Sequence, residues 1–379
     1  MVVAMSPLAI DTYLSAMPVM ADFFGVGINM IEITLTLYFL GFALGNFFGG
    51  PLSDAFGRKP IALAGITLYC LSALIIPFSE KICFIWVLRT LQAFGGGFAS
   101  VTAMVFVRDW FEGKQVARLA TIISMIMMLA PLFAPVLGAA LLSAGGWQTI
   151  FFFLTAYAIL MFLVITFIMP ESRQTEYITR RITSQQLIAN YKVFFQHKKA
   201  VAMLFTISFA MAGMFVFITS SSFIYLEFFG FKHEQFPILF GSNVVFNVIL
   251  SLMNTRLLKK YEPEQILKTG LWLQLIAGLV FFVSAIMPQP NFWLVFFSIV
   301  LYIGSLGMIF GNGTALILNK LPKISGSANA TIGVTRFVLS FVAGTLPALF
   351  HTGNLVPIGI VLLVCVLTAN GFFLLFSKN

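Results

Sequence analysis

The sequence predicts an all-α membrane protein with twelve transmembrane helices in two six-helix pseudo-repeats. Of its 379 residues, 60% are hydrophobic and 9% are charged, whereas soluble domains carry about 25% charge. The apolar residues form continuous runs of about the 20 residues that a helix needs to span a bilayer. The longest polar stretch, about 171–199, divides these runs six and six. Continuous runs exclude a membrane barrel, whose strands alternate.

Each apolar run is bounded by charged residues, Pro or Gly and predicts one transmembrane helix. The predicted helices cover residues 4–22, 33–54, 60–78, 82–106, 117–142, 148–169, 200–225, 237–257, 266–287, 291–315, 325–350 and 355–377. The first run carries Asp11 and no basic residues ahead of it. We therefore interpret it as a span and not as a cleavable signal peptide.

The basic residues predict the orientation of these helices. With a cytoplasmic N-terminus, 18 of the 22 Lys and Arg residues fall on the cytoplasmic side, whereas Lys81 and Lys232 fall outside and Arg89 and Arg336 lie within spans. This bias predicts that both termini are cytoplasmic. Orientation in a lipid bilayer thus explains the net charge of +9, and we expect no nucleic-acid partner.

The composition also excludes a soluble enzyme and a disordered chain. The three cysteines, Cys70, Cys83 and Cys365, lie in or beside apolar runs, and their spacing gives neither a metal site nor a disulfide framework. No nucleophile and base occur at a catalytic spacing. We expect a protein that is not an enzyme, with no catalytic residue, metal or cofactor.

The chain is predicted to have two halves, 1–170 and 200–379, joined by a cytoplasmic linker over 171–199. Within the linker, residues 183–196 place apolar side chains on one helical face. We interpret this segment as a helix lying at the cytoplasmic interface, with a solvated tether as the alternative. Two six-helix halves are typical of transporters, whose small-molecule site lies between the halves at mid-membrane.

Three charges lie inside predicted spans, where each costs about 2.5–3.5 kcal/mol. Asp11 is midway along the first span, and a buried carboxyl near a cation can bind and release protons. Arg89, in the fourth span, is followed by Gln92 on the same helical face. Asp11 is thus a candidate proton carrier, and the alternative is a permanent Asp11–Arg89 ion pair that only locks two helices together.

Arg336 lies about ten residues into the eleventh span, where no acidic residue of the second half is at comparable depth. An unpaired arginine in a cavity is a ready anion site; the alternative is that it bonds backbone carbonyls at a helix break. Asn243 and Asn312 also lie within spans. Such amides more often link helices than contact a ligand.

The most specific motif is the run from Gly50 to Pro60, which joins the second and third spans. It contains Gly57, which allows a tight turn, and Asp54, which can cap a helix or pair with a cation. This run resembles the cytoplasmic loop signature of the major facilitator superfamily.

Other motifs are similar to those of its drug/proton antiporters of the Bcr/CflA group, and the resemblance covers nearly the whole chain. They are Asp11-Thr12-Tyr13-Leu14 with Pro18, Arg89 with Gln92 and Gly95, Arg108-Asp109, Ala130-Pro131 through Ala134-Pro135 to Gly138, Phe223-Ile224-Tyr225-Leu226-Glu227 with Gly230, Phe240-Gly241-Ser242-Asn243, and Asn312.

The resemblance implies proton-driven efflux from the bacterial cytoplasm by alternating access, carried out by a monomer in the inner membrane. It makes Asp11 the proton-binding residue and Arg89 its modulator. The substrate-binding residues are then Tyr13, Gln92, Tyr225, Asn243, Asn312 and Arg336. A conformational latch comprises Asp54, Gly57, Arg58, Arg108, Pro131 and Pro135.

The sequence departs from the group's pattern at three positions. Ala55 replaces the usual arginine after the aspartate, which weakens the expected latch, and Ser15 stands where proline is common. Arg336 occupies a position where glutamine is expected. One alternative is therefore an exporter of an anionic metabolite, such as a carboxylate siderophore, that uses Arg336. A remote alternative is a membrane receptor or scaffold that transports nothing.

Overall fold

Every regular element in the described part of the chain is helical, as the sequence predicts. The computed structural model describes residues 2–110, 114–171, 192–321 and 325–378. Within these residues eleven helical segments are long and apolar enough to cross a membrane, and Leu129–Gly145 is a shorter apolar helix. The chain divides into two compact units, Met1–Thr183 and Ser184–Asn379. The predicted all-α membrane fold is confirmed.

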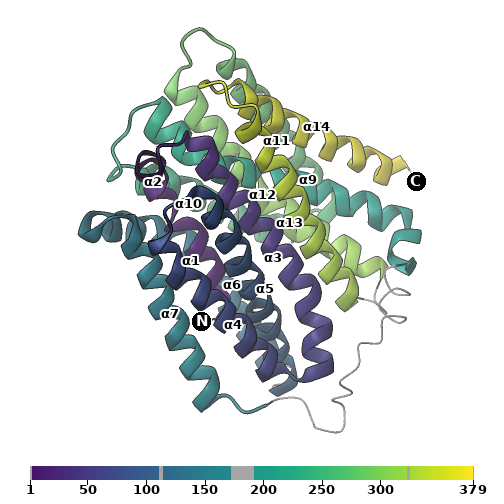
Figure 1. Cartoon of the computed structure of the whole chain (residues 1–379). Helices are drawn as coiled ribbons and strands as arrows, with labels where there is room; N and C mark the ends of the chain where they lie inside the picture. The colour runs from purple at the N-terminus through teal and green to yellow at the C-terminus, as the bar shows by residue number, and fades with distance from the viewer. Residues whose placement is uncertain (1, 111–113, 172–191, 322–324, 379) are drawn as a thin grey trace. The chain divides into compact units, whose positions relative to one another are not determined.

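The first unit contains the helices of the first six predicted spans (Figure 1). They are α1 (Met5–Asp11), α2 (Met17–Phe24), α3 (Ile28–Phe56), α4 (Arg58–Ile75), α5 (Ile82–Trp110), α6 (Lys114–Gly145) and α7 (Trp147–Ile168), with 3-10 turns η1 (Val2–Ala4), η2 (Leu14–Ala16) and η3 (Ile76–Phe78). The short helix α1 packs against α5, α6 and α7, so the centre of this unit lies around the first span.

The first span, Val2–Phe24, agrees with the predicted span over 4–22, but its α-helix has a break midway, where a turn and a 3-10 turn replace it. Helix α1 ends at Asp11, the turn η2 follows, and α2 begins at Met17. Pro18 occupies the second position of α2. A proline there has no N–H to bond the carbonyl of Leu14, and its ring would clash with that carbonyl in a continuous helix. The break therefore comes just ahead of Pro18, and it places Asp11 at a helix end.

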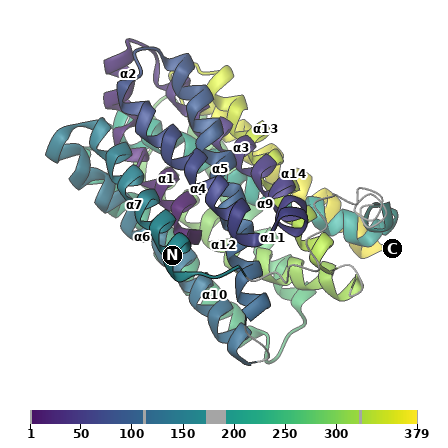
Figure 2. The ribbon, with the colours of Figure 1, turned by 60° about the horizontal axis from the view of Figure 1, so that its bottom comes forward.

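Helices α3, α4 and α5 lie side by side in the first unit, and glycines let them approach closely (Figure 2). A methyl group at Gly41 or Gly45 of α3 would meet the backbone of α5, and one at Gly65 of α4 would also meet α5. Small residues at such interfaces let membrane helices gain van der Waals contact along their backbones. The result is a rigid three-helix layer behind the first span.

The second unit contains six long helices. They are α9 (Lys198–Ser222), continued by the π-helix η5 (Phe223–Phe228), α10 (Phe236–Leu257), α11 (Pro263–Ala285), α12 (Phe292–Lys320), α13 (Ser325–Leu349) and α14 (Val356–Lys378). Most residues of α9 are buried, and α9 packs against α12, α13 and α14. The centre of this unit therefore lies around α9.

The central linker falls largely on residues 172–191, outside the described part of the chain. The predicted interfacial helix over 183–196 therefore stays a prediction. Residues 192–196 are helical, and Phe194 is fully buried among the residues described.

Candidate functional site

Asp11 lies at the last residue of α1, where the first span breaks, and it is 4% exposed. Helix α6 holds this break from one side. The Ser15 hydroxyl donates to the carbonyl of Pro135 at 3.4 Å, and a methyl group at Gly138 would meet the carbonyl of Thr12. Thus two residues of the proline- and glycine-containing motif of α6 pack directly on the backbone that follows Asp11.

Arg89 of α5 is fully buried and is held by polar atoms and aromatic rings. One terminal nitrogen donates to the side-chain oxygen of Gln92 at 2.8 Å, and the other donates to the carbonyl of Ala9 at 3.0 Å. The guanidinium carbon lies 4.7 Å from the ring centre of Tyr13 and 4.5 Å from that of Tyr38. These are cation–π distances, so the charge faces electron-rich rings.

In the described part of the chain, Arg89 and Asp11 do not form an ion pair. They are connected only through α1, which carries Asp11 and which Arg89 contacts. Arg89 bonds the carbonyl two residues before Asp11, and no cation or hydrogen-bond donor is paired with the Asp11 carboxyl in this part of the chain. The locked ion pair that the sequence left open as an alternative is therefore not the arrangement observed.

Tyr13 completes this cluster and ties it to α3. Its hydroxyl lies 2.9 Å from the Thr34 hydroxyl, which itself donates to the carbonyl of Ile31 at 2.6 Å. Because Thr34 uses its only proton there, Tyr13 donates to Thr34. The structure thus brings together three of the predicted residues, Tyr13, Arg89 and Gln92, whereas Asp11 is linked to them only through the backbone of α1.

Glu32 is another buried charged residue of the first unit, and the predicted site does not include it. It lies near the start of α3 and is 2% exposed. The apolar run predicted a span from residue 33, which placed Glu32 just outside the membrane. Helix α3 begins at Ile28 instead, so Glu32 lies inside it. The sequence signal that could have identified Glu32 is a carboxyl one residue ahead of an apolar run.

The predicted residues of the second unit are divided among three places. The Tyr225 hydroxyl, on the π-helix η5, lies beside the Asn243 side chain of α10. Asn312 of α12 donates to the Asn254 side chain of α10 at 2.8 Å and so links two helices. Arg336 of α13 lies against Phe310 and Phe337. Asn254 and the two phenylalanines did not figure in the sequence prediction.

The loop between α3 and α4 is held by a residue that the sequence reasoning missed. Gly57 has a φ of 101°, a backbone conformation that favours glycine. The carboxylate of Glu171, beyond the end of α7, accepts from the backbone N–H groups of Arg58 and Lys59 at 2.9 and 3.0 Å. Glu171 thereby caps α4, whose N-terminus attracts negative charge. The Arg58 guanidinium donates to the Ser53 hydroxyl at 2.9 Å.

Four members of the predicted latch can be placed in the structure. Gly57 and Arg58 form the turn described above, and Pro131 and Pro135 lie inside α6 without ending it. The side chains of Asp54 and Arg108 lie outside the described ones, so the latch contact between them stays a prediction.

Changing Gly57 to Ala is expected to destabilise this loop more than changing Glu171 to Gln. A side chain at Gly57 would be strained by its φ, and its Cβ would lie 2.8 Å from a carboxylate oxygen of Glu171, so we expect a loss of about 1–3 kcal/mol. Glu171→Gln weakens two charge-assisted hydrogen bonds, for a loss of about 1 kcal/mol. The melting temperature of the purified protein measures both changes. Glu80→Gln, at an exposed residue, is the matched control, and an equal effect of the two Gln variants would contradict the capping role.

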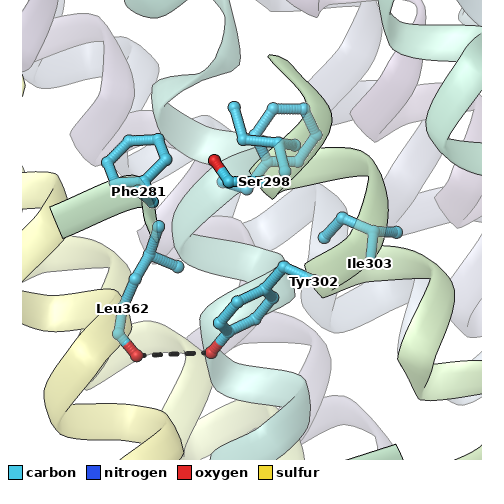
Figure 3. Close-up of a pocket in the computed structure, with 7 residues that line it drawn as sticks. Phe281, Ser298, Tyr302, Ile303 and Leu362 are labelled. Atoms are coloured by element: carbon cyan, nitrogen blue, oxygen red, sulfur yellow. Dashed lines mark hydrogen bonds between the residues drawn. The ribbon is translucent and has the colours of Figure 1, made fainter. Parts of the chain in front are cut away.

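A small pocket in the second unit contains none of the predicted site residues. Figure 3 shows its mostly apolar lining, in which the Tyr302 hydroxyl donates to the carbonyl of Leu362 at 3.4 Å. The lining residues are Phe217, Phe281, Ser298, Ile299, Tyr302, Ile303 and Leu362. It carries no charge, so it offers a ligand no polar anchor beyond Ser298 and Tyr302. Among the described residues no group of His, Cys, Asp and Glu is placed to hold a metal ion.

Long apolar helices in two units, with charges buried inside the spans, define a multi-pass membrane protein. The chain belongs to the Major Facilitator Superfamily, whose family model matches residues 1–345. The resemblance stated from the motifs is thereby confirmed, and the protein is a transporter and not an enzyme.

Its relatives include proteins named for drug resistance. The bicyclomycin resistance protein homolog of Haemophilus influenzae is 29% identical over 375 residues, covering 98% of this chain and 94% of the relative. The multidrug resistance protein MdtL of Escherichia coli is 24% identical, covering 88% of this chain and 83% of the relative. The predicted relationship to the Bcr/CflA group agrees with these matches.

Solved structures establish the same fold. A bacterial homolog of the human lysosomal transporter Spinster, inward-facing and unoccupied, matches with a TM-score of 0.74 at 12% identity, covering 100% of this chain and 95% of that chain. A D-xylose–proton symporter matches with a TM-score of 0.70 at 15% identity, covering 98% of this chain and 96% of that one.

Proposed function

We propose that this transporter is a proton-coupled exporter of small molecules in the bacterial inner membrane, working by alternating access. Relatives over nearly the whole chain are named for bicyclomycin and multidrug resistance, which supports export. The distribution of Lys and Arg supports an orientation with both termini in the cytoplasm. We expect the protein to act as a monomer.

The observation that carries the proposal is the setting of Asp11. Its carboxyl is buried at a helix break inside a span, and no described residue is paired with it. A charged carboxylate without a counter-ion is costly in such a place, so the neutral acid is the favoured form in this conformation. Exposure to water in the opposite conformation would allow the proton to leave. Asp11 can then carry a proton across the membrane once in each cycle.

Arg89 is proposed to couple the charge of Asp11 to the shape of the first span. It binds the carbonyl of Ala9 in the last turn of α1, two residues before the carboxyl. When Asp11 is ionised, its charge attracts the guanidinium away from the rings of Tyr13 and Tyr38. The hydrogen bond to Ala9 then strains or breaks, and the end of α1 moves against α6. Protonation would restore the arrangement observed.

The energy available is sufficient for useful export. A membrane potential of about 100 mV supplies about 2.3 kcal/mol for each charge moved, which corresponds to roughly a fiftyfold gradient of a neutral substrate. One proton per cycle, carried by one carboxyl, is thus enough to drive antiport.

Transport-linked pH changes in proteoliposomes test this function. With a hydrophobic cation, a neutral phenicol and a polycarboxylate as trial substrates, we expect the wild type to move protons with at least one of them. Asp11→Asn keeps the size and polarity of the side chain but cannot ionise, so proton movement should fall to the level of empty vesicles. Asp22→Asn, at an exposed residue of α2, should behave like the wild type. Substrate flux without proton movement, unchanged by Asp11→Asn, would contradict the proposal.

A further inference from the structure

Arg336 is a charged residue in the middle of a span, and its guanidinium lies against two aromatic rings. It is the ninth residue of the span Ala328–Leu349. Its guanidinium carbon lies 4.6 Å from the ring centre of Phe337 and 5.2 Å from that of Phe310 on α12. The side chain is partly exposed, whereas its Nε atom is enclosed and has no hydrogen-bond partner.

The second unit contains no carboxylate at this depth to balance the charge. Its acidic residues are Glu227, Glu234, Glu262 and Glu264. Two of them precede or follow the spans, and the other two lie in the first or last turn of a span. A charge at the middle of a span is costly. The two rings offer cation–π contacts, but they carry no negative charge to neutralise the guanidinium.

Two glycines near this residue and its ring partner are uncovered. Gly333 is one helical turn before Arg336 on the same face of α13, and Gly311 follows Phe310 on α12. A methyl group at either glycine would meet no heavy atom within 4 Å. Most glycines inside the long helices of this unit, such as Gly213, Gly304 and Gly313, are instead closely covered by neighbouring side chains. Among the described residues, the face of α13 that carries Arg336 is therefore uncovered one turn before it.

We propose that Arg336 binds the carboxylate of an organic anion, whose apolar or aromatic body packs against Phe310 and Phe337. The planar guanidinium can donate two parallel hydrogen bonds to a carboxylate, and the phenyl rings hold its plane in a fixed orientation. The bound anion would supply the missing counter-charge. This inference rests on the proposed export function and names a substrate class for it.

Ligand-dependent thermal stability of the purified full-length protein tests the site. The probe is benzoate, and the control ligand is benzamide, which has nearly the same shape and no charge. Benzoate should raise the melting temperature of the wild type, whereas benzamide should not. Arg336→Gln should weaken the apparent benzoate affinity by at least about tenfold. Arg256→Gln, which removes an exposed arginine of α10, should leave it unchanged.

A second variant keeps the test valid if Arg336→Gln fails to fold. Gly333→Leu covers the face of α13 one turn before Arg336 and keeps the charge, so it should also abolish the benzoate response. Gly371→Leu, on α14, is the matched control, since a side chain there also meets nothing within 4 Å. No benzoate response in the wild type, an equal response to benzamide, or a full response in Arg336→Gln or Gly333→Leu would each overturn the proposal.

The outcome is separable from that of the proton-coupling test. If Asp11→Asn has no effect on proton movement but benzoate binding depends on Arg336, the anion site stands and the proton-coupled mechanism fails. If proton movement with a neutral phenicol depends on Asp11 while Arg336→Gln binds benzoate like the wild type, the mechanism stands and the anion site fails.

Discussion

Replacing Arg89 with leucine is expected to reduce substrate-coupled proton movement to background while the protein still reaches the membrane. The substitution removes charge-assisted hydrogen bonds to Gln92 and to the carbonyl of Ala9, each worth about 1.5–3 kcal/mol. It also removes the cation from the rings of Tyr13 and Tyr38. The end of α1 then no longer responds to the charge on Asp11. Transport in proteoliposomes measures the effect.

Arg89→Lys separates the charge of this residue from its shape. Lysine retains the positive charge but lacks the planar fork that reaches two acceptors and stacks on rings. We expect a loss of more than about tenfold, which corresponds to about one charge-assisted hydrogen bond. Lys81→Met removes an exposed cation ahead of α5 and should leave transport unchanged. Wild-type transport by Arg89→Lys and Arg89→Leu alike would contradict a coupling role for this residue.

Replacing Gly138 with alanine is expected to be strongly damaging. The added methyl would lie within contact distance of the Thr12 carbonyl, and neither backbone can rotate away as a side chain can. Overpacking of this kind costs about 1–3 kcal/mol or more. Helix α6 must then separate from the break in the first span, which also lengthens the contact from Ser15 to Pro135. We expect a lower melting temperature and a transport loss of more than about tenfold.

Gly371→Ala provides the control for this experiment. Gly371 lies in a span as Gly138 does, yet a methyl group there meets nothing within 4 Å. The control should have wild-type stability and transport, because alanine is also the better helix former. Equal behaviour of Gly138→Ala and Gly371→Ala would show that the close approach of α6 to the first span is unnecessary.

The membrane fold could be predicted from the sequence because the bilayer imposes simple requirements on the chain. Continuous apolar length locates the spans, and the placement of Lys and Arg orients them. The break in the first span could not be located in this way. Its cause, Pro18, is visible in the sequence, but a proline in a membrane helix can kink, break or be tolerated. Only the packing of α6 against Thr12 and Ser15 decides among these.

The candidate site was predictable where a charge lies inside a span and less so elsewhere. Asp11 and Arg89 were recognised because burying them is costly, and the structure buries both within the first unit. Their lack of an ion pair depends on Tyr13 and Tyr38, whose position over the guanidinium no local pattern encodes. Glu32 was missed because it lies one residue outside an apolar run, and Glu171 because its partner is 112 or more residues away.

The broken first span also has a consequence for how the protein is made. Its two helices, of seven and eight residues, are each too short to cross a bilayer, and the buried segment joining them completes the span. One of the groups that cover this segment is on α6, 120 residues further along the chain. The middle of the first span therefore makes its final contacts only after the fifth span has been synthesised. We expect the first span to stay within the translocation machinery, or bound to an insertase, until α6 has been synthesised.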